Sequence, residues 1–349
     1  MDTLRTAHGE LALPAFLPDA TRGVVRAVDA ADLRAAGVPA VMVNALHLSQ
    51  RPGTSAIRRL GGVHRFMDWD RPVFSDSGGF QVYSLGTASP ELVRVSRRGF
   101  AWRRRKGGRR RLLTPEKCIQ RQFDLGADVM FCLDLCTHPD QPESLQREAV
   151  ARTVDWSRRS RAEFDRRLER WPAERPRPLL FAVVQGGASI DLRRECSERL
   201  LEIGFDGYGF GGWPVDAEGR LVEMVEVVAG LLPPGAPKHA LGIATPENVA
   251  RAWRAGYGVF DCALPTRDAR HGRLMIREDG RDRYLYMRDR ERVLEDRPVE
   301  DECDCATCRR FSRAYLHHLF RIGDAAAARL ATIHNLRFYV RLMERLRGA

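Results

Sequence analysis

Three closely spaced cysteines and one distant histidine have the clearest potential chemistry in this chain. Cys303, Cys305 and Cys308 are followed by His334, which lies in Ala328–Arg347, a segment whose apolar residues recur with helical spacing. Three thiolates and one imidazole form a closed tetrahedral set for Zn²⁺, which is typical of structural sites. We therefore predict one structural zinc ion; the alternative is a group of ordinary buried thiols. The other five cysteines are scattered, as in a reduced protein without disulfides.

Two aspartates, Asp76 and Asp261, could carry out acid–base or nucleophilic chemistry. Paired carboxylates serve proton transfer, or displacement at a sugar carbon where one carboxylate captures an oxocarbenium-like centre. Gly78 and Gly79 follow the first aspartate and would allow a ligand to approach the backbone closely. Phe80 offers a ring on which a planar base can stack. The pattern favours chemistry at a nucleoside.

Further polar residues could recognise such a ligand. Asp134 and Gln185 supply acceptors and donors suited to the edge of a guanine-like heterocycle. Arg267 and Arg270 follow Asp261 closely and could hold phosphates or neighbouring bases.

A basic segment between residues 94 and 113 suggests the nature of the partner. The chain has a formal net charge of +11, and Gly107-Gly108 lies between two basic runs in Arg103–Arg111. This pattern predicts a hairpin tip with positive charge on both arms. Such a patch attracts polyanions, and nucleic acid is the first candidate. The alternative is an arginine-rich surface that reflects a high-GC genome.

Length and composition agree with one large α/β unit. The 349 residues are 44% hydrophobic, enough for a full core, and Met1–Phe16 lacks an apolar signal core. No apolar run approaches the ~20 residues that span a bilayer. We expect a cytoplasmic protein without a membrane segment.

These residues must be positioned by alternating strands and helices. Strands are predicted at Ala40–Asn44, Val73–Asp76, Val129–Asp134, Leu179–Gln185, Gly207–Gly211, Ala240–Ile243 and Val259–Cys262. Helices are predicted at Ala30–Ala36, Pro115–Leu125, Leu145–Glu169, Ile190–Ile203, Glu218–Leu232 and Pro246–Ala255. The pattern predicts an α/β (β/α)₈ barrel whose eighth strand has no assigned place, with an open doubly wound sheet as the alternative.

The strand ends favour the barrel. Nearly every predicted strand ends in a polar residue or glycine: Asn44, Asp76, Asp134, Gln185, Gly211-Gly212, Gly242 and Asp261. In a (β/α)₈ barrel the carboxyl ends of the strands converge on one site. We expect residues 1–290 to form this barrel with the basic hairpin inserted near 94–113, and residues 291–349 to form a zinc-binding helical subdomain.

Long motifs along almost the whole chain resemble the tRNA-guanine transglycosylase (queuine tRNA-ribosyltransferase) family. They are the segments 75–82, 185–186, 203–208 with 211–212, 260–262 with 264–267, the cysteines at 303, 305 and 308, and the segments 312–319 and 334–335. The resemblance implies a zinc-containing barrel enzyme that exchanges guanine in tRNA, at wobble position 34 of GUN anticodons, for a 7-deazaguanine. It also implies a homodimer.

The resemblance implies that Asp261 is the nucleophile at C1′ and that Asp76 is the general acid/base. The implied base-binding residues are Asp76, Ser77, Gly78, Gly79, Phe80, Asp134, Gln185, Gly211, Gly212, Trp213 and Leu241. The implied RNA contacts are Gly242, Ile243, Ala244, Thr245, Pro246, Glu247, Asn248, Thr266, Arg267, Asp268, Ala269 and Arg270.

Departures from the family pattern concern the incoming base. Leu135 and Ala217 stand where bacterial members carry acids, so a partner for an aminomethyl group is missing or moved to Asp216 or Glu218. Trp213 adds bulk on the side of the 7-substituent. The base therefore stays open among the aminomethyl form (preQ1), the nitrile form (preQ0) and queuine. A paralogue acting on DNA and a non-catalytic partner subunit are the alternative functions, although both catalytic aspartates are present.

Overall fold

Eight short parallel strands form the central barrel of the computed structural model, which describes residues 2–348. Their order around the sheet is β3-β13-β12-β11-β10-β9-β5-β4. The strands are β3 (Ala15–Pro18), β4 (Val41–Asn44), β5 (Val73–Asp76), β9 (Val129–Phe131), β10 (Leu179–Val184), β11 (Gly207–Phe210), β12 (Lys238–Leu241) and β13 (Val259–Cys262). A parallel bridge between Asp19 and Met42 joins the two ends, so the predicted barrel is confirmed and the open sheet is excluded.

The strand that the sequence left without a place is β3. It pairs in parallel with β13, and Ala20 donates a backbone hydrogen bond of 2.7 Å to Met42. It follows directly on an antiparallel hairpin of β1 (Thr3–Thr6) and β2 (Gly9–Ala12). Because no helix separates these three strands, the strand–helix alternation that identified the others gave no signal here.

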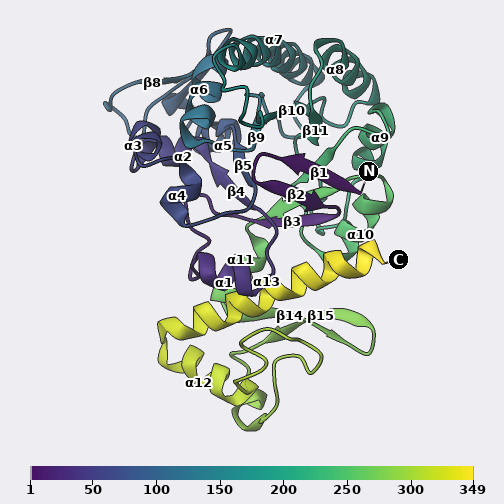
Figure 1. The fold of residues 1–349 in the computed structure, drawn as a ribbon. Coiled ribbons are helices and arrows are strands. Elements are labelled where there is room, and N and C mark those ends of the chain that lie inside the picture. Colours follow the sequence, from purple (N-terminus) through teal and green to yellow (C-terminus); the bar gives the residue numbers. More distant parts are fainter. Residues whose placement is uncertain (1, 349) are drawn as a thin grey trace.

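Helices surround the barrel (Figure 1). The predicted ones correspond to α1 (Ala30–Ala35), α6 (Pro115–Leu125), α7 (Glu143–Leu168), α8 (Ile190–Ile203), α9 (Glu223–Leu231) and α10 (Pro246–Arg254). Shorter helices that were not predicted are α2 (Ala45–Gln50), α3 (Thr54–Arg59), α4 (Val63–Met67), α5 (Gly79–Ala88) and α11 (Leu264–Arg270). The start of α9 was predicted five residues too early, because residues 215–221 form a bridged turn in which Asp216 pairs with Arg220.

Local sequence explains why α6 begins and ends where it does. The Thr114 side chain accepts a hydrogen bond from the Lys117 amide, and Pro115 occupies the first turn. Gly126 ends the helix with φ +74°, a conformation that glycine adopts readily.

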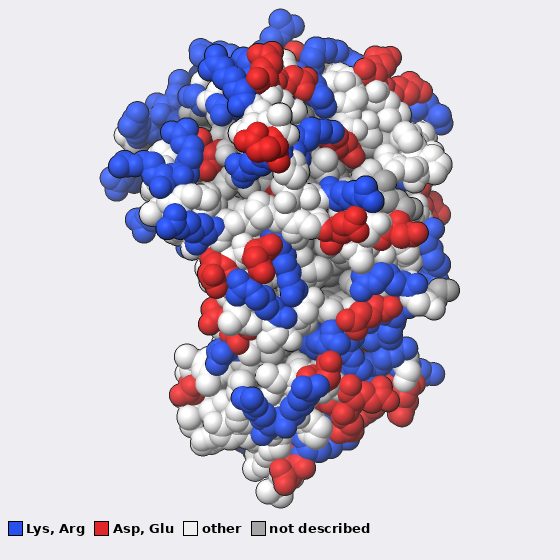
Figure 2. Space-filling model, in the orientation of Figure 1, with Lys and Arg blue, Asp and Glu red and all other residues white. Residues whose placement is uncertain are grey.

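The basic segment forms a three-stranded antiparallel sheet of β6 (Val93–Ser96), β7 (Gly99–Trp102) and β8 (Arg111–Leu113). The β7–β8 pairing confirms the predicted hairpin, whose tip is residues 103–110. Phe100 and Trp102 are buried and hold the sheet on the barrel, with Phe100 edge-on to Trp156 at 5.1 Å. Figure 2 shows Lys and Arg side chains gathered at the upper left, where Figure 1 places β8 and α3.

The C-terminal part contains a hairpin of β14 (Arg273–Glu278) and β15 (Arg281–Tyr286), the helix α12 (Arg313–Ile322) and the long helix α13 (Ala325–Arg347). In Figure 1, α13 lies between the barrel and the remaining C-terminal elements. Asn335 on α13 accepts from the Met275 amide and donates to the Pro265 carbonyl oxygen, and Tyr339 donates to the Ala244 carbonyl oxygen at 2.7 Å. The subdomain boundary at residue 290 stays a prediction. Two 3₁₀ turns complete the elements, η1 (Pro90–Leu92) and η2 (Arg290–Leu294).

Candidate active site

One cavity of about 360 Å³ lies at the carboxyl ends of the barrel strands. All the strand-end residues singled out in the sequence line it: Asn44, Asp76, Asp134, Gln185, Gly211, Gly212, Gly242 and Asp261. Ser77, Phe80, Trp213 and Leu241 line it too. The barrel therefore brings together residues that are up to about 220 positions apart in the chain.

Asp76 is held at the end of β5 by three donors. Its Oδ2 accepts from Asn44 Nδ2 at 2.7 Å and from Gln81 Nε2 at 3.1 Å, and its Oδ1 accepts from the Gly78 amide at 3.3 Å. Burial raises the pKa of this carboxyl group, although the three hydrogen bonds act in the opposite direction. A carboxyl group with a raised pKa is suited to proton transfer near neutral pH.

Glycines shape the loop behind Asp76. Gly78 has φ +84°, and a Cβ atom there would lie 2.3 Å from the Cβ of Leu46, so only glycine fits. Gly79 begins α5, and its backbone amide donates to the Ser77 hydroxyl group. Neither glycine is part of the cavity wall; their contribution is to turn the chain so that Asp76 and Phe80 reach it.

Asp261 lies on β13 and is anchored through one oxygen. Its Oδ1 is 2.8 Å from Nε2 of His239 and accepts from the Gly242 amide at 3.4 Å. Both contacts involve Oδ1, so Oδ2 is the oxygen left for a ligand. His239 was missed because the predicted strand began at Ala240, whereas β12 starts at Lys238.

A fourth aspartate, Asp19, lines the cavity together with Asp76, Asp134 and Asp261, and it was not predicted from the sequence. It follows β3, the strand that had no assigned place, and a carboxylate after the apolar run 15–18 was the only signal available. Burial raises the pKa of Asp19 to about 7, and the negative charges of Asp261 and Asp76 add to the effect. The cavity thus gathers several carboxyl groups that hold protons more tightly than usual, which suits them to hydrogen bonding and proton transfer with a ligand.

Asp134 and Gln185 form the polar pair predicted for the edge of a heterocycle. Gln185 Nε2 donates to Asp134 Oδ2 at 2.7 Å, while Gln185 Oε1 is buried and has no partner within residues 2–348. Burial raises the pKa of Asp134 to about 7, so this group can donate as well as accept near neutral pH. A Cβ atom on Gly211 would lie 2.4 Å from Gln185 Nε2, which explains the glycine beside this pair.

Aromatic rings gather at one side of the cavity. Phe80 is 47% exposed, and its ring centroid lies 5.9 Å from that of Trp213. Two rings that the sequence analysis did not include, Tyr83 and His138, lie 6.1 Å and 4.9 Å from Trp213. This group provides flat apolar surface for a planar base and narrows the space beside it.

The two segments implied to contact RNA follow β12 and β13. Gly242 lines the cavity, but six of the twelve residues are buried: Ile243, Ala244, Asn248, Thr266, Asp268 and Ala269. The Asn248 side chain accepts a hydrogen bond from the Leu221 amide, and Asp268 forms an ion pair with Arg273 at 2.7 Å. These two side chains therefore stabilise the fold. The prediction of RNA contact through side chains therefore remains only for the more exposed members, Arg267 among them.

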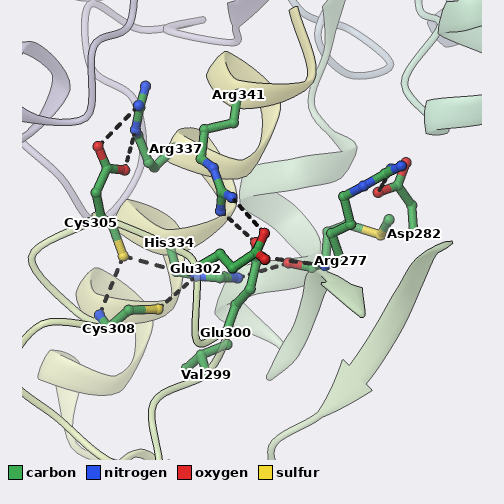
Figure 3. Close-up of polar contacts among 12 residues, drawn as sticks. Arg277, Asp282, Val299, Glu300, Glu302, Cys305, Cys308, His334, Arg337 and Arg341 are labelled. Atoms are coloured by element: carbon green, nitrogen blue, oxygen red, sulfur yellow. Dashed lines mark hydrogen bonds and ion pairs between the residues drawn. The ribbon is translucent and has the colours of Figure 1, made fainter. Parts of the chain in front are cut away.

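The Cys303, Cys305, Cys308 and His334 side chains come together as predicted and are all buried. His334 Nδ1 lies 3.3 Å from Cys308 Sγ and 3.9 Å from Cys305 Sγ (Figure 3). The other ring nitrogen of His334 is 2.7 Å from the carbonyl oxygen of Met275, the contact that fixes the tautomer of metal-binding imidazoles. These four residues could hold one metal ion.

A second group of possible metal ligands lies away from the cavity. His8 Nδ1 and His64 Nε2 are 2.7 Å and 3.1 Å from the two carboxylate oxygens of Asp128. The two imidazoles are stacked, with centroids 3.5 Å apart and planes inclined by 16°. Because the lone pair of an imidazole nitrogen lies in the ring plane, two nearly parallel stacked rings cannot both direct a lone pair at one ion. The geometry favours hydrogen bonds between the imidazoles and Asp128 that tie the β1–β2 hairpin to the barrel.

None of the helices among the described residues is sufficiently long and apolar to span a membrane.

Comparison with known proteins gives one consistent result. The family model described as "Queuine tRNA-ribosyltransferase" matches residues 1–349. A queuine tRNA-ribosyltransferase of Syntrophobacter fumaroxidans is 40% identical over 347 residues, which cover 99% of this chain and 88% of the relative. Proteins of the same name from Shewanella halifaxensis and Shewanella sediminis are 40% and 39% identical over 343 residues, which cover 98% of this chain and 87% of each relative.

Proposed function

Because this chain belongs to the queuine tRNA-ribosyltransferase family, we propose that it is a tRNA-guanine transglycosylase, a pentosyltransferase that exchanges guanine in tRNA for a 7-deazaguanine. The observation that carries the proposal is the single cavity in which Asp76 and Asp261 lie with the Asp134–Gln185 pair. A nucleophile, a proton donor and a base-reading pair are the groups that base exchange requires.

The reaction proceeds by two displacements at C1′ of the target ribose. Oδ2 of Asp261 forms a bond to C1′ while the bond from C1′ to N9 of guanine breaks, and Asp76 supplies the proton that the departing base takes up. The incoming base then returns a proton to Asp76, and its N9 forms a bond to C1′ as the bond to Asp261 breaks. The raised pKa of Asp76 supports this role, since the group must hold a proton near neutral pH.

Base recognition rests on the cavity wall. Asp134 and Gln185 face the donors and acceptors of the guanine edge, and the unpartnered Gln185 Oε1 is available for one more hydrogen bond. Phe80 stacks on the base. The target is expected to be position 34 of GUN anticodons, and the basic hairpin tip 103–110 is expected to bind the tRNA backbone.

The metal is proposed to be one structural zinc ion held by Cys303, Cys305, Cys308 and His334. The donor set is soft, buried and complete, so the ion would hold the C-terminal part together without taking part in base exchange. A homodimer and a cytoplasmic location remain predictions.

The test is base exchange by the purified chain. Labelled guanine should enter unmodified tRNA and should be displaced by preQ1, preQ0 or queuine, whereas DNA of the same sequence should not incorporate it. Incorporation into DNA would favour the DNA-acting alternative. Absence of exchange by the chain alone, with activity restored by a second protein, would favour the partner-subunit alternative.

A further inference from the structure

The contact beneath Asp261 involves a histidine in an unusual environment. His239 lies on β12, its side chain is fully buried, and its Nε2 is 2.8 Å from Asp261 Oδ1. Its ring is edge-on to Phe74 at 5.9 Å and to Phe131 at 5.4 Å. Its Nδ1 is buried without a hydrogen-bond partner in the described chain.

This environment determines which form of the imidazole is favoured. If Nδ1 carried a proton, a buried N–H donor would have no acceptor, which costs more than an unused lone pair. The favoured form is therefore the neutral tautomer with its proton on Nε2, which donates to Asp261 Oδ1. A protonated ring would require the unpaired donor at Nδ1 and is disfavoured for the same reason.

We propose that His239 is a positioning residue for base exchange, a neutral imidazole that fixes Asp261 through Oδ1 and leaves Oδ2 as the attacking oxygen. The inference rests on the proposed role of Asp261 as the nucleophile. The Gly242 amide, 3.4 Å from the same Oδ1, is the second anchor. Because Nδ1 is buried without a partner in the described chain, His239 has no second group to which it could relay a proton, so it stabilises the ionised carboxylate without competing with Asp76 in proton transfer.

The other titratable groups around Asp261 do not supply this anchor. The titratable groups that face it are Asp19 after β3, Asp76 at the end of β5, the adjacent Cys262 and His239 itself. Two of these are carboxyl groups, and the charge of Asp261 helps to raise the pKa of both, so neither supplies a positive partner for it. His239 is the side chain among them that donates a hydrogen bond to the nucleophile.

The test compares His239→Leu, which lacks a donor, with His239→Gln, whose Nε2 amide group can donate from a similar distance along the side chain. For His239→Leu, kcat should fall about 10- to 100-fold, the range expected when a hydrogen bond to a charged group is lost. The KM for tRNA should stay within about twofold. The acidic limb of the kcat/KM profile should move to higher pH by about one to two units, since the ionised carboxylate loses its donor. His239→Gln should recover most of the wild-type kcat, and the acidic limb of its kcat/KM profile should lie at the wild-type pH.

Asp19→Asn serves as the matched control: burial raises the pKa of Asp19 to about 7, so this group is already neutral across the acidic limb, and the limb should stay in place. A folded His239→Leu enzyme with wild-type kcat and an unmoved limb would overturn the proposal. If His239→Leu does not fold, the His239→Gln enzyme provides the test. A wild-type pH profile of kcat/KM in this variant would support a neutral donor at position 239. Loss of a limb of that profile near neutral pH would show that His239 titrates in the wild-type enzyme and would refute the proposal.

Asp261→Asn separates this inference from the proposed function. Normal base exchange by Asp261→Asn would show that Asp261 is not the nucleophile and would contradict the proposed mechanism. An inactive Asp261→Asn together with an unaffected His239→Leu would remove only the positioning role.

Discussion

Selectivity for the incoming base can be worked out from the acids that the cavity lacks. An aminomethyl group is cationic at neutral pH and gains from a nearby carboxylate. Bacterial members of the family carry acidic residues at the positions that Leu135 and Ala217 occupy in this chain. The nearest acids in the sequence that could replace them are Asp216 and Glu218. In the structure both substitutes pair with Arg220, at 2.9 Å and 3.1 Å, and neither lines the cavity.

Without such an acid, the enzyme should lose affinity for preQ1. One hydrogen bond to a charged group contributes about 1.5–3 kcal/mol, which corresponds to roughly 10- to 150-fold in affinity. We therefore expect preQ0 or queuine to be used at least as well as preQ1. The Trp213 ring narrows the side of the cavity where the 7-substituent should lie, so queuine is accepted only if its cyclopentene ring stacks on this indole.

Competition kinetics with the three bases on one tRNA measure this directly as ratios of kcat/KM. Ala217 is exposed and does not line the cavity, so the wild-type preference itself is the test of the missing acid. The reasoning would be refuted if the wild-type enzyme preferred preQ1 by more than about a hundredfold, because backbone carbonyl groups or another acid would then supply the missing contact.

Three further predictions test other parts of the structure. Cys303→Ser should lose the bound metal and lower the unfolding temperature, because binding energy at a closed zinc site is folding energy; a stable variant with one zinc per chain would contradict this. Asp134 has a pKa raised to about 7, so the folded state holds a proton that the unfolded state releases near 3.8, and stability falls as pH rises from about 4 to 7. Asp134→Asn should remove this dependence, so that its stability relative to wild type is about 1–2 kcal/mol higher at pH 8 than at pH 5. This is less than the ~2.7 kcal/mol of the two pH units between pH 5 and the folded pKa, because the site is partly open. Equal differences by urea unfolding at the two pH values would contradict it. Replacing Arg103, Arg104 and Arg105 by alanine should raise the KM for tRNA and reduce its salt dependence by about one phosphate contact per arginine that contacts the backbone, with kcat unchanged; an unchanged salt slope would exclude the hairpin as a tRNA contact.

The strand ends could be predicted from sequence because polar residues that follow apolar runs are a local pattern. Asp76, Asp134 and Asp261 were found in this way, and their convergence followed from the barrel. Asp19 was missed because its strand follows a hairpin and is not preceded by a helix. His239 was missed because the predicted strand began one residue after it, and a buried histidine gives no signal of its own until its partner is known.

Partners across the barrel depend on register, which no local pattern encodes. The contact between His239 and Asp261 requires β12 and β13 to pair with Leu241 opposite Asp261. Likewise, the engagement of Asp216 and Glu218 by Arg220 depends on a turn that was predicted as the start of a helix. The cysteine set was different, since three of its four ligands are neighbours in the chain and their spacing alone identified them.

The central claim is that Asp261 forms a covalent bond with C1′ of the target ribose. The most direct measurement is to mix the purified enzyme with labelled tRNA, quench with denaturant, and look for RNA that stays attached to protein. The wild-type enzyme should give a labelled adduct that disappears when excess guanine or 7-deazaguanine is added before quenching. Asp261→Asn should bind tRNA with similar affinity, form no adduct and exchange no base. An Asn variant that turns over at a near-normal rate, or an adduct that maps to another residue, would contradict the account.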